Sequence, residues 1–145
     1  MKKPLGKEIN ELGRDVKKFL HYHLDGYSLG DGQFGILYEV FHSPGISQEK
    51  LSKKRNVDKT TTAKAVKKLI NNGYIQREKD KADKRVYCLL CTEKAVELMP
   101  EIERVIKLEN EVLTESLSED EVEVFRKIMG KMTKSIDKHL KEMEG

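Results

Sequence analysis

The clearest chemical pattern in the sequence lies between positions 58 and 71, which we predict to be a helix capped by Asp58. On a helical wheel, one side of this segment is apolar (Thr62, Val66, Leu69 and Ile70, with Ala63 at the edge) and the other is polar (Thr60, Thr61, Lys64, Lys67 and Lys68). Threonine methyl groups and lysine ammonium groups can contact base edges and phosphates, so the polar side predicts a helix that enters the major groove of DNA. The alternative is an ordinary amphipathic helix whose lysines face solvent.

A second charged segment, residues 77–85, mixes both signs between two short β-rich segments at 74–77 and 86–91. This pattern predicts a hairpin with a long polar tip. Asp83 next to an arginine can hold a guanidinium in one direction through a two-pronged contact, and the partner is Arg77 or Arg85. The alternative is a solvated turn with incidental ion pairs, each worth at most about 1 kcal/mol.

The remaining elements must position these two segments. Apolar spacing, caps and breakers predict helices at 7–24, 32–42 (capped by Asp31), 47–54 (capped by Ser47), 92–115 (interrupted and kinked by Pro100) and 118 to about 139 or beyond. The expected order is α-α-α-α-β-β-α-α, a mainly helical chain with a small hairpin wing, which describes a winged helix-turn-helix. We expect an N-terminal dimerisation helix at 1–28, a DNA-binding domain at 29–92 and C-terminal dimerisation helices at 93–145. The apolar stripes of the terminal helices exceed what the central module can cover, which favours a second copy of the chain.

Charge is distributed unevenly along the 145 residues. Residues 1–52 are neutral, residues 53–92 carry 12 basic and 4 acidic side chains (+8), and residues 93–145 have a net charge of −5. A compact basic segment is typical of a module that binds a polyanion, although a solvated charged surface is the alternative. Apolar runs are too short for a membrane span and the N-terminus lacks a signal peptide, so we expect a soluble cytoplasmic protein without a membrane partner.

From Leu29 to Ala95 the sequence resembles the MarR family of multiple-antibiotic-resistance regulators. The residues that carry the resemblance are Leu29, Gln33, Phe34 and Leu37, then Ser47-Gln48-Glu49-Lys50-Leu51, Val57-Asp58-Lys59-Thr60-Thr61, Val66, Leu69, Asn72-Gly73-Tyr74-Ile75-Gln76-Arg77, Asp83-Lys84-Arg85 and Thr92. The Asp-x-Arg wing, followed by a strand and a helix-opening threonine, is the most diagnostic of these. Cys91 and Ala95 depart from the usual leucine and glycine, and both lie away from the expected DNA face.

The resemblance implies a homodimer that binds pseudo-palindromic double-stranded DNA, with half-sites roughly 10–10.5 bp apart. It places the helix at 58–71 in the major groove and Arg85 in the minor groove. The residues that we expect to contact DNA are Ser47, Asp58, Lys59, Thr60, Thr61, Lys64, Lys67, Lys68, Arg77, Asp83, Lys84 and Arg85. The implied function is a transcriptional regulator, and specifically a repressor. The alternative is a sequence-tolerant architectural DNA-binding protein without an effector response.

Many members of the family release DNA when a small anionic aromatic compound binds between the dimerisation helices and the winged module. Such a ligand needs a cation and an aromatic wall. Lys7, Arg14 and Tyr38 are our candidates, with Lys17 or His42 as further possibilities, and the alternative is that these are ordinary surface cations.

Other chemistry finds little support in the sequence. Cys88 and Cys91 match C-x-x-C, but on a strand they point to opposite faces and no second pair exists to complete a zinc site, so inert thiols are favoured over a redox role. The histidines are isolated or poorly spaced for chelation. No phosphate loop, nucleophile elbow or catalytic constellation is present, so we expect no enzyme activity, no cofactor and no metal site.

Overall fold

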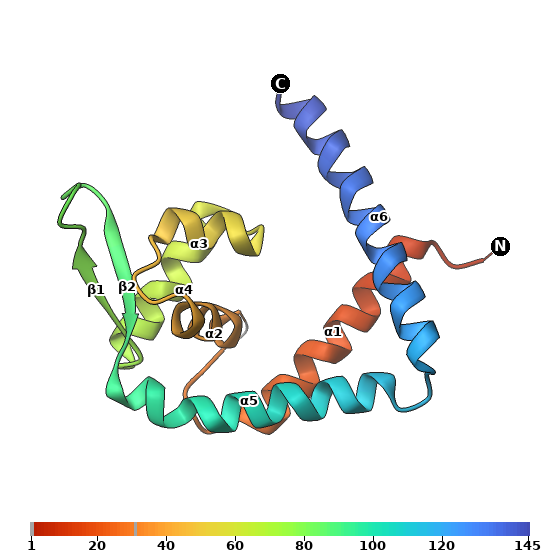
Figure 1. Cartoon of the computed structure of the whole chain (residues 1–145), viewed down its shortest axis with the longest axis horizontal. Coiled ribbons are helices and arrows are strands. Elements are labelled where there is room, and N and C mark those ends of the chain that lie inside the picture. Colours follow the sequence, from red (N-terminus) through yellow and green to blue (C-terminus); the bar gives the residue numbers. More distant parts are fainter. Residues whose placement is uncertain (1, 31) are drawn as a thin grey trace. The chain divides into compact units, whose positions relative to one another are not determined.

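The computed structural model describes residues 2–30 and 32–145 (Figure 1). The helices and strands occur in the predicted order. They are α1 (Leu5–Leu24), α2 (Gln33–His42), α3 (Gln48–Arg55), α4 (Lys59–Asn71), β1 (Ile75–Lys79), β2 (Tyr87–Cys91), α5 (Glu93–Thr114) and α6 (Glu119–Glu144). The chain forms two compact units, residues 1–109 and 110–145. Within the described residues, no helix combines the length and apolar character needed to cross a membrane.

Helix starts agree with the sequence to within two residues. α1 begins at Leu5, earlier than expected, because the Pro4 carbonyl accepts the N–H groups of Lys7 at 3.0 Å and Glu8 at 3.2 Å. α2 begins at Gln33, one residue later than expected, after Gly32 with a left-handed φ of 80°. The expected cap of α2, Asp31, lies outside the described residues.

Side-chain caps open the pair of helices α3 and α4, as predicted. The hydroxyl of Ser47 accepts the Lys50 N–H at 3.1 Å, and the Asp58 carboxylate accepts the Thr61 N–H at 3.0 Å. Such caps satisfy backbone donors that have no partner inside the helix. α4 is closed by Gly73, whose φ of 79° is in the left-handed region that glycine favours.

The wing is an antiparallel hairpin in which Ile75 pairs with Cys91 and Lys79 with Tyr87. β1 extends two residues further than expected. The segment before α3 also pairs with the wing, since Ser47 bridges Cys88 and the Leu89 N–H donates to the Ile46 carbonyl at 2.9 Å. This third edge could not be predicted from the sequence, because backbone pairing between distant segments leaves no local pattern.

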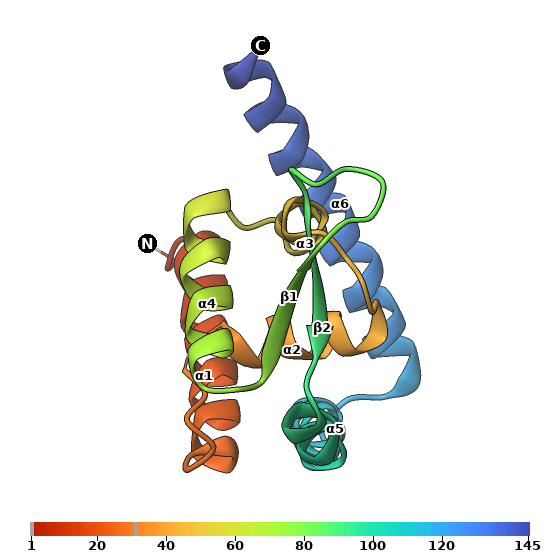
Figure 2. The same ribbon diagram turned by 90° about the vertical axis from the view of Figure 1, so that its left-hand side faces the viewer.

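The core of the first unit joins every element of the winged module to α5. Leu37, Leu51, Leu69, Leu89 and Ile102 are fully buried and come from α2, α3, α4, β2 and α5 respectively. Figure 2 shows α2 behind the hairpin, with α4 on one flank. This shared core holds the wing and α4 in a defined relation to each other.

α5 continues through Pro100 from Glu93 to Thr114, so the long helix is confirmed without an interruption, and the kink expected at Pro100 stays a prediction. Pro100 removes one backbone donor, but its neighbours Met99 and Ile102 are buried in the core and hold the helix together. The helix opens at Thr92, whose hydroxyl accepts the Ala95 N–H at 3.3 Å and donates to the Gly73 carbonyl at 2.6 Å.

α6 is longer than the expected minimum and ends at Glu144. It opens with the predicted capping box, in which Ser118 accepts the Glu121 N–H at 3.1 Å and the Glu121 carboxylate accepts the Ser118 N–H at 3.0 Å. All of its residues are described, and none of them is buried.

Candidate nucleic-acid interface

α4 presents the predicted polar face to solvent. Thr62, Val66 and Leu69 are buried, whereas the polar residues are exposed, namely Thr60, Thr61, Lys64, Lys67 and Lys68. One boundary differs from the wheel: Ala65 is half-buried at the edge of the core, and Ala63 is exposed. A helical wheel does not show which residue at the edge of the apolar face is buried, because that depends on where the neighbouring elements pack against α4.

The N-terminal end of α4 carries a fixed negative charge. Hydrogen bonds from Thr61, from its side chain and then from its backbone, hold the pKa of Asp58 below its ordinary value. Asp58 is therefore ionised at neutral pH and acts here as the cap that orients the first turn. Lys59, the next residue, is exposed beside it.

The C-terminal end of α4 is tied to elements outside the helix-turn-helix. The Lys94 ammonium on α5 donates to the Asn72 carbonyl at 2.7 Å and lies 4.3 Å from the centre of the Tyr74 ring. The Asn72 amide donates to the Ser28 carbonyl at 3.0 Å, and the Tyr74 hydroxyl donates to the Tyr27 carbonyl. These contacts could not be predicted from the sequence, because partners 20 to 47 positions apart leave no spacing signal.

In the wing, Asp83 pairs with Arg85 and not with Arg77. The Asp83 carboxylate accepts Nε of Arg85 at 3.0 Å and Nη2 at 3.2 Å. This contact lowers the pKa of Asp83. Asp83 also accepts the Arg85 N–H at 3.1 Å, so it shapes the turn and directs the guanidinium together. The Arg85 side chain is nevertheless 90% exposed and free to contact a ligand.

Arg77 has a different partner within the hairpin. Its guanidinium lies 4.4 Å from the centre of the Tyr87 ring, a cation–π contact. Asp80, which also lies in the tip, accepts the Ala82 N–H at 3.0 Å. Asp80 and Asp83 therefore order the backbone of the tip, and Lys84 is exposed between Asp83 and Arg85.

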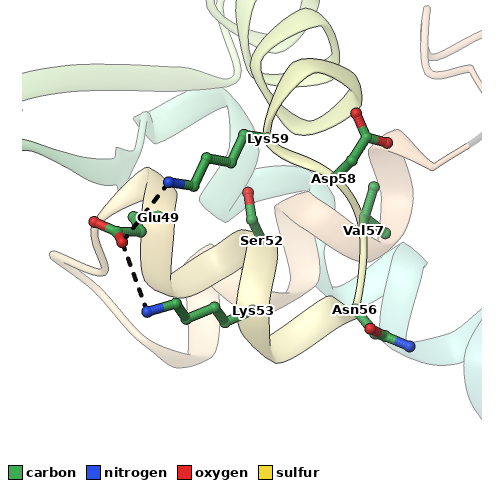
Figure 3. A pocket seen from close by; sticks show the side chains of 7 residues that line it. All are labelled: Glu49, Ser52, Lys53, Asn56, Val57, Asp58 and Lys59. Carbon is green, nitrogen blue, oxygen red and sulfur yellow. Dashed lines mark ion pairs between the residues drawn. The ribbon is translucent and has the colours of Figure 1, made fainter. Parts of the chain in front are cut away.

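The junction between α3 and α4 holds an acidic residue, Glu49, for which the sequence alone indicated no role at the site. Glu49 pairs with Lys53 at 3.6 Å and with Lys59 at 3.9 Å, across a shallow pocket of about 300 Å³ (Figure 3). Asn56, Val57 and other residues of the turn complete its lining. Ser47, at the start of α3, is half-buried and uses its hydroxyl oxygen as the helix cap.

The proposed effector residues lie on two separate helices, Lys7 and Arg14 on α1 and Tyr38 on α2. Tyr38 is half-buried, and its ring centre lies 4.3 Å from that of His42, which pairs with Glu103 of α5 at 3.4 Å. Lys7 and Arg14 are exposed on α1. Figure 1 shows the N-terminal end of α1 projecting away from α2, so the effector site stays a prediction. Lys17 is likewise exposed.

The cysteines lie on β2 as free thiols. Burial raises the pKa of Cys91 to about 11, so this thiol is protonated at neutral pH and is a poor nucleophile. Within residues 2–30 and 32–145, no cluster of three or more histidine, cysteine, aspartate or glutamate side chains is arranged to hold a metal ion.

Comparison with known proteins agrees with this architecture. The sequence model of the MarR family matches residues 29–87. The HTH-type transcriptional regulator YybA of Bacillus subtilis is 30% identical over 132 residues, which cover 91% of this chain and 88% of YybA.

Two solved structures show the same fold. The transcriptional regulator SlyA is 31% identical, with a TM-score of 0.88 over 94% of this chain and 96% of that one. A MarR family transcriptional regulator from Listeria monocytogenes, solved in complex with a 26mer DNA, is 30% identical, with a TM-score of 0.88 over 100% of this chain and 97% of that one. The winged helix-turn-helix, the diagnostic wing and these similarities together show that the chain belongs to the MarR family of transcriptional regulators.

Proposed function

We propose that this protein is a homodimer that binds a pseudo-palindromic double-stranded operator and represses transcription by occluding a promoter. The observation that carries the proposal is the exposed threonine and lysine face of α4 beside a wing whose Arg85 is aimed by Asp83. In both views, the tip of the wing and the N-terminal end of α4 lie at the same end of the module (Figures 1 and 2).

In this proposal, different parts of the chain have different roles. Residues 29–92 contact DNA, with α4 in the major groove and Arg85 in the minor groove. Residues 1–28 and 93–145 pair with a second copy, which places two recognition helices on successive turns of the same duplex. Exposed apolar side chains on the terminal helices, such as Ile9, Leu12, Ile128 and Ile136, supply the interface.

Duplex binding tests the proposal directly. The probe is the DNA upstream of the protein's own coding region, scanned for an inverted repeat, and the control is a scrambled duplex of equal length. We expect the repeat to bind about 10³-fold or more tightly than the control at fixed salt. Equal affinities for the two duplexes would instead support a sequence-tolerant architectural protein.

We also propose that a small anionic aromatic effector releases the protein from its operator. Tyr38 supplies the aromatic wall, Lys7 and Arg14 supply the cations, and binding changes the distance between the two recognition helices of the dimer. Salicylate is a suitable probe. It should raise the melting temperature of the protein and weaken operator binding, and a compound that does neither is not an effector.

A further inference from the structure

Glu49 is an acidic residue beside the proposed interface that, unlike Asp58, caps no helix. It lies in the first turn of α3, and its carboxylate oxygen Oε1 is shared between the ammonium groups of Lys53 at 3.6 Å and Lys59 at 3.9 Å. Lys59 is the first residue of α4 and belongs to the surface proposed to bind DNA. Figure 3 shows both lysines reaching toward this one carboxylate.

These ion pairs contribute little to the fold. The side chains are 58% (Glu49), 75% (Lys53) and 78% (Lys59) exposed, and pairs between exposed side chains are weak. Ser47 already caps α3 without help from Glu49. The main physical consequence of Glu49 is therefore electrostatic: a negative charge stands beside two cations that a phosphate could otherwise contact.

We propose that Glu49 acts as an electrostatic brake on DNA binding, by competing with DNA phosphates for Lys53 and Lys59. This inference rests on the proposed function. Lysine–phosphate contacts release counterions and supply most of the affinity that is independent of sequence. A carboxylate that occupies these lysines, and repels an approaching phosphate, lowers that affinity for every duplex by the same factor.

The direction of the effect separates this role from the other ways in which a glutamate could act at a DNA surface. A glutamate that accepts a hydrogen bond from cytosine N4 would strengthen operator binding, so its removal would weaken binding to the operator alone. A glutamate that only supports the helix would leave the DNA affinity of the folded protein unchanged. A brake alone predicts tighter binding when the charge is removed.

The test is Glu49→Gln, measured in the full-length protein by fluorescence anisotropy with the inverted-repeat duplex and the scrambled duplex. At 50 mM salt we expect both affinities to rise about threefold to tenfold, because one unit charge near a phosphate is worth roughly a fivefold change in water. The plot of log affinity against log salt should steepen by up to about one unit. Glu119→Gln removes another exposed carboxylate, from the first turn of α6, and should change neither quantity.

A double variant tests the route. In Lys59→Gln, adding Glu49→Gln should give a smaller gain than it gives in the wild-type protein, since one of the two competing cations is gone. If folded Glu49→Gln binds DNA with unchanged affinity, or binds the operator more weakly, the proposed role of Glu49 is overturned. If the glutamine variant does not fold, Glu49→Ala takes its place in the test. If the folded wild-type protein binds neither duplex, the proposed function fails as well, whereas wild-type binding that Glu49→Gln leaves unchanged overturns only this inference.

Discussion

The winged module and the last helix use similar apolar residues with opposite outcomes. In the module, Leu37, Leu51 and Leu69 have no exposed surface. In α6, most of the large apolar side chains are between 42% and 72% exposed, namely Val124, Phe125, Ile128, Met129, Ile136, Leu140 and Met143. One chain therefore completes the core around α2, α3 and α4, whereas it leaves most of the apolar side chains of α6 exposed.

The charge of the chain changes sign at residue 92. Residues 53–92 carry a net charge of +8, which suits a polyanion, and residues 93–145 carry −5, which does not. Substitutions in one region should therefore change DNA affinity without changing the oligomeric state, and substitutions in the other should change the oligomeric state.

The largest expected effect comes from placing charges in the stripe of α6. Ile128→Glu combined with Ile136→Glu should abolish the dimer, because two carboxylates would be buried without partners in each interface. Sedimentation at micromolar concentration should then give a monomer, and operator affinity should fall because one half-site is lost. Lys131→Glu on the same helix is the matched control and should remain dimeric. A wild-type protein that sediments as a monomer would contradict the dimer.

Shortening one leucine side chain in the winged module and one in α6 should change the free energy of unfolding by different amounts. In the monomeric background of that double variant, Leu69→Ala should lower the free energy of unfolding by about 2–5 kcal/mol, because it leaves a cavity in a closed core. Leu140→Ala should change it by less than about 0.5 kcal/mol, because the side chain is on the surface of the monomer. Urea denaturation measures both, and equal costs would show that α6 is packed within one chain.

The wing should affect DNA binding without affecting assembly. Arg85→Ala should weaken operator binding about tenfold or more at fixed salt, because it removes the minor-groove contact, while the protein stays dimeric. Asp83→Ala keeps the guanidinium but frees it from its partner, so its loss of affinity should be smaller. If Arg85→Ala binds as well as the wild-type protein, the wing does not anchor the complex.

The smallest expected effect is the pH dependence of the Asp83–Arg85 contact. Its contribution is fully present above the ordinary aspartate pKa of about 4, because Asp83 has a lowered pKa in the folded protein. It is lost as the pH falls through that lowered pKa. NMR titration of the Asp83 carboxyl and the Arg85 Nε–H should show the two signals changing together at acidic pH. A transition near neutral pH would contradict the lowered pKa of Asp83.

Much of the fold could be predicted because its signals are local. Ser47, Asp58 and Ser118 cap the predicted helices, and Gly73 closes α4. α5 continues through Pro100, where an interruption was expected, because buried neighbours such as Met99 can outweigh the local effect of a proline. The edge formed by residues 45–47 was missed for the converse reason, since its partner is distant in sequence.

The polar face of α4, the accumulation of positive charge and the family motif of the wing could all be read from the amino-acid sequence, because periodicity, composition and spacing are properties of the chain. Only the tertiary structure decided that Asp83 pairs with Arg85, that Arg77 stacks on Tyr87, that Lys94 holds the end of α4 and that Glu49 is shared between two lysines. Each of these depends on which side chains packing brings within a few ångströms, and one-dimensional spacing does not contain that information.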